Sequence, residues 1–467
     1  MLLDQTAVPA RVPNTSVENL RGRLLGPLIT PTDIDYAAAR RVWNKEFDRR
    51  PAAIIRALDA MDVKFGLTFA REHGLPVAVR SGGHSLAGFS SVDQGVVLDL
   101  SLLKRVSIDA ATATASVQPG VTSERLAPLA AEYGLGLSTG DAPTVGIGGL
   151  TLGGGIGFMV RQYGLTIDSL LSAEVVTANG RIVTASPTEH PDLFWALRGG
   201  GGNFGVVTSF QFQLRPVGTV VGGAIVTPAT GRSVRTYLEH AANAPDGLTT
   251  ITFLLNAPPL PFVPSHLVGT PVLLVLAVFV GDLEAGRAAL DPLRRLGPET
   301  VDVTGPMPYP AIFDFTRDPT VSSHHYGRST FLDDIPEHLA ERLVDHVRRG
   351  TSPLSFVQLR PLGGALARVP VEATAFAHRN RRFMLSIIND WDGPDADNSA
   401  PHRAWVDDLW QSVQPLGSGV YVNFLEGDER HRMHQAYPSQ TYARLADVKR
   451  RYDPDNVFRL NQNITPA

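Results

Sequence analysis

The chain has 467 residues, of which 43% are hydrophobic and 19% charged, and its formal net charge is −4 at pH 7. These values are typical of a globular protein with a sizeable core, and the length predicts two domains or one domain with an insertion. The charge gives no support to a nucleic-acid partner or an anionic membrane surface. Cysteine is absent, which excludes disulfides, thiolate metal sites and cysteine nucleophiles.

We expect neither a secretion signal nor a membrane span. Residues 1–17 contain few apolar side chains and no signal-peptide core. The longest apolar run, residues 271–280, is too short to cross a bilayer and predicts a buried strand. These patterns predict a soluble, cytoplasmic protein with no membrane partner.

The first half of the chain predicts short strands and helices. Helices are expected over residues 36–74, with a start at Pro51 and a stop at Gly74. An amphipathic helix over 122–133 should end at Gly134, where glycine takes a left-handed C-cap at low cost. A hairpin over 174–186 should turn at Asn179-Gly180, the pair that best accepts a type I′ turn. Strands are expected at 76–79, 96–100, 106–109, 115–118 and 206–214, and a helix at 192–198.

The sequence changes in character after Pro216. Glycine clusters become rare, and two strand–helix units follow, at 222–242 and 272–296. Repeated units of this kind suggest an antiparallel sheet backed by helices, within an α+β fold. We therefore expect three parts: a first domain at 1–216, an inserted second domain at 217–418, and a segment at 419–467 that returns to the first domain.

Three glycine-rich segments carry the chemistry, at residues 80–85, 140–157 and 198–205. Successive amide groups in such turns bind anionic oxygens, and the missing Cβ atoms allow close approach, so a pyrophosphate is the expected ligand. Any one segment is explained equally well as a ligand-free turn, but the presence of three such segments favours a ligand-binding role. The third segment fits G-x-G-x-x-G literally, yet a helix precedes it and a strand follows, so it is no Rossmann motif.

These segments, together with Tyr421-Val422-Asn423 and the C-terminal motif at 451–464, resemble one flavoenzyme family. The chain is similar to the berberine-bridge-enzyme-like group of the p-cresol methylhydroxylase and vanillyl-alcohol oxidase superfamily, over residues 35–214 and at the C-terminus. The resemblance implies a two-domain FAD-binding fold of the p-cresol methylhydroxylase (PCMH) type, whose inserted antiparallel sheet covers the substrate. It also implies FAD as cofactor, a small-molecule substrate, O2 as electron acceptor, and a monomer or homodimer.

The resemblance assigns covalent flavin attachment to His84, whose imidazole nitrogen would bond to the flavin 8α-methyl carbon. A lone histidine is otherwise more often a satisfied surface or core group. Many relatives add a second link through a cysteine at the position of Ala142, so this chain is expected to carry a single link. In relatives, a small or β-branched residue at the position of Val145 accompanies oxygen access, which favours an oxidase. By resemblance, the residues that line the cofactor are Arg80, Ser81, Gly82, Gly83, His84, Ser85, Gly88, Gly140, Thr144, Val145, Gly149, Gly153, Gly157, Val207, Tyr421, Asn423, Asn461 and Asn463.

Phe424 departs from the family pattern. Relatives that oxidise alcohols or phenols often carry a tyrosine there as catalytic base, and general-base catalysis is worth about 10²–10⁴-fold. Either another group, such as Tyr421, accepts the proton, or the substrate needs no base, as with a free amine or a polyketide or quinone-type secondary metabolite. If Tyr421 and Phe424 share a strand, their spacing puts them on opposite faces, and packing is then the more natural role for Tyr421.

In the second domain, the strand at 355–362 is expected by analogy to line the substrate site. Gln358 and Arg360 share a face of it and, with Phe424, are the candidate substrate-binding residues. Arg360 would favour an anionic or carbonyl-bearing substrate, although a surface ion pair is the slightly favoured alternative. The pair His378-Arg379 has no assignable role. We expect His324-His325 and His431 with His434 to be solvated and to bind no metal, because carboxylates at ligand spacing are missing.

Three functions compete at this point. The leading one is an FAD-dependent oxidase that releases H2O2. The second is a flavin-containing protein that binds a drug and confers resistance with little turnover. A serine hydrolase is the third, because residues 83–87 approach the G-x-S-x-G motif, but Ala87 replaces its last glycine.

Overall fold

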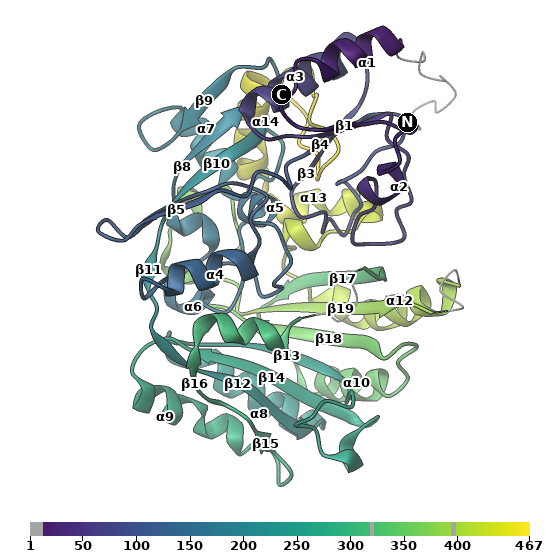
Figure 1. Ribbon diagram of the computed structural model, residues 1–467. Helices are drawn as coiled ribbons and strands as arrows, with labels where there is room; N and C mark the ends of the chain where they lie inside the picture. The colour runs from purple at the N-terminus through teal and green to yellow at the C-terminus, as the bar shows by residue number, and fades with distance from the viewer. Residues whose placement is uncertain (1–12, 318–321, 394–397) are drawn as a thin grey trace.

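The computed structural model describes residues 13–317, 322–393 and 398–467. Residues 1–12, which include most of the stretch expected to lack a signal peptide, lie outside the described residues. Figure 1 shows two bodies: one holds the C-terminus and the glycine-rich segments, and the other is a large sheet with helices on one face. The α+β, PCMH-type architecture is therefore confirmed.

A small sheet near the N-terminus has the order β1-β2-β4-β3. Its strands are β1 (Leu28–Ile29), β2 (Ala53–Arg56), β3 (Val77–Arg80) and β4 (Val96–Asp99), and the helices beside it are α1 (Asn14–Arg21), α2 (Tyr36–Ala39) and α3 (Ala60–Glu72). The prediction of helices over residues 36–74 was wrong between α2 and α3. Ile54 and Ile55 are buried there in β2, which pairs in parallel with β4, because β-branched side chains fill a buried sheet well.

The second sheet of this body has the order β5-β6-β10-β8-β9, and all its pairs are antiparallel. Gly180 in the β8–β9 hairpin has φ of +77°, but Asn179 does not have a positive φ. The turn is therefore not type I′: the Gly180 amide donates to Thr177 O at 2.8 Å, and glycine alone takes the left-handed position. The strands are β5 (Val106–Asp109), β6 (Thr114–Val117), β8 (Leu170–Val176), β9 (Ile182–Ala185) and β10 (Val206–Gln213).

The remaining elements of this body surround the second sheet. They include a two-stranded pair, β7 (Leu135–Gly136) with β11 (Arg215–Pro216). The helix expected at 122–133 is confirmed as α4 (Ser123–Ala131), and that at 192–198 as α7 (Pro191–Leu197). Further helices are α5 (Ile147–Gly153), α6 (Val160–Tyr163), α13 (Met433–Ala436) and α14 (Ser439–Tyr452).

The large sheet has eight strands in the order β15-β12-β14-β13-β18-β19-β17, with β16 paired to β12. Its long strands are β12 (Thr219–Pro228), β13 (Leu248–Asn256), β14 (Pro271–Phe279), β17 (His324–Leu332), β18 (Leu354–Pro361) and β19 (Phe383–Trp391), and its short strands are β15 (Val301–Asp302) and β16 (Gly305–Pro308). All the pairs are antiparallel, as expected.

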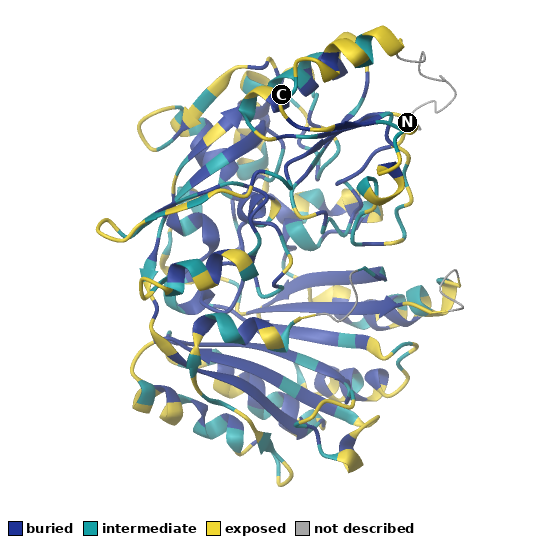
Figure 2. Ribbon diagram, in the orientation of Figure 1, coloured by how far each residue is buried: buried dark blue, intermediate teal, exposed yellow. Residues whose placement is uncertain are grey.

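Helices cover one face of the large sheet, and Figure 2 shows buried strands against helices that expose their outer sides. They are α8 (Gly231–Ala242), α9 (Leu283–Arg294), α10 (Glu337–Val347) and α12 (Ala400–Val413), whereas the short α11 (Ala365–Arg368) packs on α6. The opposite face of the sheet contacts the glycine-rich body.

The C-terminal segment packs into the glycine-rich body. Tyr437 and Leu445 join the same hydrophobic core as Phe210 of β10. Lys449 of α14 is fully buried, and its ammonium group donates to Asp453 and to the backbone oxygens of Asn203 and Phe458. This contact fixes the third glycine-rich segment. Among residues 13–317, 322–393 and 398–467, no helix is both long and apolar enough to cross a membrane.

Candidate functional site

The three glycine-rich segments converge. The first follows β3 and contacts the second directly, since a Cβ atom on Gly82 would lie 2.6 Å from the amide nitrogen of Gly146. The third is tied to the second by the amides of Gly199 and Gly201, which donate to Leu152 O at 3.1 and 3.0 Å. Segments far apart in the sequence thereby present their backbones to one region.

His84 projects from the first segment and is half-buried. Its Nε2 forms a hydrogen bond of 3.1 Å with Thr144 Oγ1 of the second segment. Its ring stacks on Trp43, with ring centroids 5.5 Å apart and an interplanar angle of 24°. The imidazole is therefore held by a hydrogen bond and an aromatic ring.

The predicted cofactor residues fall into two groups. Gly82, Thr144 and Gly149 are exposed, and Ser81, Ser85 and Val145 are half-buried around His84, so they are accessible to a ligand. Arg80 and Val207 are buried and have packing roles: Arg80 donates to Asp99 at 2.9 Å, and Val207 pairs with Val175 in the core. Gly83, Gly88, Gly140, Gly153 and Gly157 are buried as well.

Asn423 and Phe424 lie in the turn η6 (Val422–Phe424), and Tyr421 directly precedes it. Tyr421 and Phe424 therefore do not share a strand, and the opposite-face arrangement, which required one, does not apply. Residues three apart in such a turn lie on the same side, and the two rings stack 5.6 Å apart. The amide of Gly155 and the Asn423 side chain donate to the Tyr421 hydroxyl oxygen, at 2.8 and 2.9 Å. Burial raises the pKa of Tyr421 to about 12, so its phenol holds its proton at neutral pH.

The tail also places amide groups beside the third glycine-rich segment. The Asn461 side chain donates to Gly202 O at 3.0 Å. The side-chain oxygens of Asn461, Gln462 and Asn463 are buried but accept no hydrogen bond from the described residues. Buried acceptors of this kind require donors, and the hydroxyl and amino groups of a dinucleotide can supply them.

Arg360 is 4% exposed and is no surface residue, so the slightly favoured alternative of a surface ion pair was wrong. Its guanidinium donates to both carboxylate oxygens of Asp141, at 3.0 and 2.9 Å, and to Gln358 Oε1 at 2.8 Å. It also lies over the Phe424 ring, 5.3 Å from the centroid. β18 carries Arg360 on the face turned toward the glycine-rich body, and Asp141 belongs to the second glycine-rich segment. The ion pair therefore joins the two bodies at the site.

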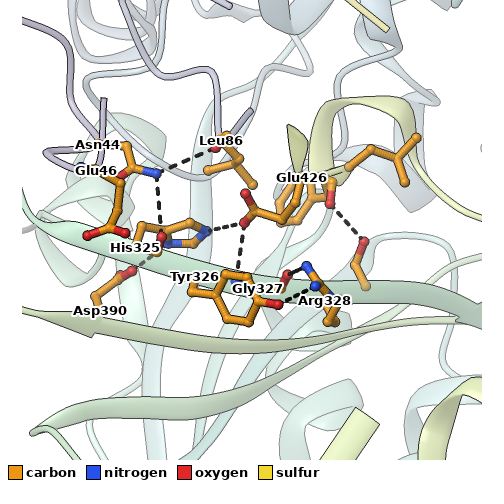
Figure 3. Close-up of polar contacts among 12 residues, drawn as sticks. Asn44, Glu46, Leu86, His325, Tyr326, Gly327, Arg328, Asp390 and Glu426 are labelled. Carbon is orange, nitrogen blue, oxygen red and sulfur yellow. Dashed lines mark hydrogen bonds and ion pairs between the residues drawn. The ribbon is translucent and has the colours of Figure 1, made fainter. Parts of the chain in front are cut away.

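His325 is likewise not solvated, contrary to expectation: it is 4% exposed. Its Nδ1 donates to Asp390 at 2.5 Å, and its Nε2 forms an ion pair with Glu426 at 3.2 Å (Figure 3). Burial alone would lower the pKa of His325, but the two carboxylates outweigh it and raise the pKa to about 10. The second predicted solvated pair, His431 and His434, is exposed, and within the part of the chain that the structure describes no group of three or more His, Cys, Asp or Glu side chains is arranged so that it could hold a metal ion.

His378 and Arg379 are both buried. Arg379 donates to both oxygens of Asp168, at 2.7 and 2.8 Å, and to Thr374 Oγ1 at 2.7 Å. His378 Nε2 bonds to Gln435 O at 2.7 Å, and burial lowers the pKa of His378 to about 4. The pair that had no role from sequence thus anchors the loop between β18 and β19.

This burial predicts a pH effect on stability. Because the folded pKa of His378 lies below its unfolded value of 6.5, the unfolded chain gains a proton first, and stability is lost as pH falls from 6.5 toward 4. Between pH 6.5 and 4.5 we expect wild type to lose about 2 kcal/mol more unfolding free energy than His378→Gln. Urea unfolding of both proteins at the two pH values measures this difference, and parallel losses would contradict it.

Four residues of the site were not predicted from the sequence: Trp43, Asp141, Asp390 and Glu426. Asp141 had a detectable signal, because a carboxylate inside a glycine-rich run next to the expected attachment region is conspicuous. The other three are recognised only through partners distant in the sequence, which no local pattern reveals.

Known proteins match the chain along most of its length. Residues 51–186 match the family model described as an FAD binding domain, and residues 420–465 match the model described as berberine and berberine like. The chain is 32% identical to (R)-6-hydroxynicotine oxidase of Paenarthrobacter nicotinovorans over 463 residues, covering 94% of this chain and 97% of that protein.

Solved structures show the same fold. The crystal structure of 6-hydroxy-D-nicotine oxidase from Arthrobacter nicotinovorans superposes with a TM-score of 0.85 at 29% identity, covering 95% of this chain and 98% of that one. Xylooligosaccharide oxidase from Myceliophthora thermophila, in complex with xylobiose, gives a TM-score of 0.83 at 26% identity, covering 97% and 99%. The chain belongs to the berberine-bridge-enzyme-like family of FAD-linked oxidoreductases.

Proposed function

We propose that the chain is an oxidase that holds FAD through a single covalent bond from His84 and passes electrons from a small organic substrate to O2. The observation that carries this proposal is the contact of the first two glycine-rich segments beside His84, whose ring is held by Thr144 and Trp43, with the third segment tied to the second through Leu152. Bonding an imidazole nitrogen to the 8α-methyl carbon replaces one N–H and one C–H hydrogen, and O2 takes up both with their electrons as H2O2.

The residues present fit FAD. Gly149 and Gly202 have no chain atom within 4 Å of the position of a Cβ, so backbone is open to a ligand there. The buried side-chain oxygens of Asn461 and Asn463 accept no hydrogen bond from the described residues, so a ligand can supply the donors. Ala142 offers no thiol for a second link. When bound, FAD supplies a two-electron acceptor that takes hydride from the substrate and returns the electrons to O2.

We assign the cofactor to residues 1–216 with 419–467, and the cover of the substrate site to residues 217–418. The glycine-rich segments and the tail belong to the first set, and β18 and β19 belong to the second. The bidentate pair between Asp141 and Arg360 spans this division. It supports a substrate site at the boundary of the two bodies.

An amine is the substrate class that these residues favour. Phe424 cannot accept a proton, and the phenol of Tyr421 is buried with a pKa raised to about 12. A free amine loses hydride without a base, so it needs neither group. Arg360 is already neutralised by Asp141, which weakens the case for an anionic substrate. A quinone-type or polyketide metabolite that needs no external base is the second choice.

Acid precipitation of the purified protein tests the proposed link. We expect a yellow pellet and a colourless supernatant, and H2O2 release when amines are supplied in air. Yellow colour only in the supernatant would refute the covalent bond, and the absence of colour after incubation with FAD would refute the cofactor. If an amine bleaches the flavin under anaerobic conditions but no H2O2 is released in air, the protein is a dehydrogenase and not an oxidase.

Gly149→Ala separates cofactor binding from folding. Gly149 lies in the helix α5, where alanine is favoured over glycine by up to about 1 kcal/mol, and no chain atom obstructs the new methyl group. We therefore expect the apoprotein to keep or gain stability, while FAD incorporation falls. Gly218→Ala is the matched control, since Gly218 also has open space around it but lies between β11 and β12. Equal FAD incorporation in both variants would show that Gly149 does not contact the cofactor.

A further inference from the structure

A buried charged cluster lies where three distant parts of the chain meet, and the proposed function does not use it. His325 of β17 lies between Asp390 of β19 and Glu426 of the C-terminal segment (Figure 3). Glu426 Oε1 also accepts a hydrogen bond from the Gly327 amide at 3.1 Å. The two carboxylates therefore fix both the orientation and the charge of the His325 ring.

Trp43 connects this cluster to His84. Its indole lies 5.3 Å from the His325 ring, measured between centroids, and 5.5 Å from the His84 ring. The Trp43 amide donates to Gly83 O at 3.2 Å, directly beside His84 in the chain. The Asn44 side chain contacts both sides as well, because its Nδ2 lies 3.5 Å from Leu86 O and 3.4 Å from His325 O (Figure 3).

These residues are linked by contacts all the way from the charged cluster around His325 to His84. A cation beside an indole ring is attracted to it, so the imidazolium of His325 holds Trp43 in place. Trp43 in turn limits the rotation of the His84 ring. A nucleophile that must meet one carbon atom depends on such orientation, and a displacement of about 1 Å costs roughly 10²-fold in rate.

We propose that Trp43 and His325 are positioning residues that orient the His84 imidazole for its covalent bond to FAD. This inference rests on the proposed link at His84. Asp390 and Glu426 act through His325, and none of the four touches the reacting atoms. These four residues come from both bodies and from the C-terminal segment. Covalent attachment of FAD therefore becomes efficient only when all three parts are assembled.

The rate of covalent attachment tests the inference. Apoprotein from riboflavin-starved cells is mixed with FAD, quenched in acid at intervals, and assayed for flavin fluorescence in denaturing gels. We expect Trp43→Leu and His325→Gln to attach FAD roughly 10- to 100-fold more slowly than wild type, while the total FAD bound stays unchanged. Trp43→Phe keeps an aromatic ring and should restore most of the rate.

His378→Gln is the matched control. His378 is another buried histidine packed on an aromatic ring, 4.9 Å from Phe331, but it has no ring contact with Trp43 or His84. It should attach FAD at the wild-type rate. Glu426→Gln, which keeps the shape of the side chain, supplies a milder test if His325→Gln folds poorly, and it too should slow attachment.

Two outcomes would overturn the inference. Wild-type rates in Trp43→Leu, His325→Gln and Glu426→Gln would show that the cluster does not act on His84. A joint fall in thermal stability and total FAD, with an unchanged attachment rate per bound FAD, would leave only a structural role. If wild type itself forms no acid-stable flavin, the proposed link fails and this inference fails with it, so the two failures are distinguishable.

Discussion

Replacement of His84 by alanine is expected to move all the flavin from the acid pellet to the supernatant while the protein stays folded. The variant loses the hydrogen bond to Thr144 and the ring contact with Trp43. Both involve a half-buried side chain, so the free energy of unfolding should fall by about 1 kcal/mol or less. The glycine-rich backbone remains, and FAD should still bind reversibly.

The visible spectra of pellet and supernatant, with the intact mass of the protein, measure this result. His73→Ala is the matched control, because His73 is also half-buried, contacts the Phe69 ring with centroids 4.5 Å apart, and lies in the same body. It should keep the flavin in the pellet. Acid-stable flavin in His84→Ala would place the bond on another residue.

Arg379→Met is expected to destabilise the protein severely. The Arg379 side chain is 0% exposed and binds Asp168, which is itself 9% exposed. Without its partner, the Asp168 carboxylate stays buried with an uncompensated charge, and losses of about 3–5 kcal/mol are typical. Since domains have only about 5–15 kcal/mol of stability, a loss of this size approaches unfolding.

Urea denaturation measures this loss. Arg235→Met is the control, because Arg235 pairs with Glu239 on the surface of α8 and such pairs contribute less than about 1 kcal/mol. Adding Asp168→Leu to Arg379→Met should recover part of the stability by removing the unpaired charge. Similar small losses in Arg379→Met and Arg235→Met would contradict the prediction.

Local patterns in the sequence were sufficient for much of the fold. The helix α4 and the antiparallel sheet backed by helices follow from periodicity and capping, which operate over a few residues. β2 was missed because the pairing of Ile54 and Ile55 with β4, more than 40 residues later, decides its conformation. The β8–β9 turn differs from expectation because Gly180 alone adopts the left-handed conformation.

In the site, too, contacts between residues distant in the sequence could not be predicted. The glycine-rich segments and His84 are contiguous motifs, so the sequence identifies them and the resemblance assigns their roles. Arg360 is buried because Asp141, 219 positions earlier in the chain, neutralises it. His325 is buried because Asp390 and Glu426 flank it. Neither partnership has a local signature, so both side chains look like ordinary surface residues in the sequence.

The buried ammonium group of Lys449 has a consequence for how the protein matures. It binds the backbone of Asn203, 246 positions earlier, so the third glycine-rich segment gains this contact only after the chain has been synthesised past residue 449. Contacts of such long range form late, because the chain must first close a large loop. Cofactor capture is therefore expected to follow synthesis of the helix α14, and cells short of flavin should accumulate chains that contain this helix but carry no colour.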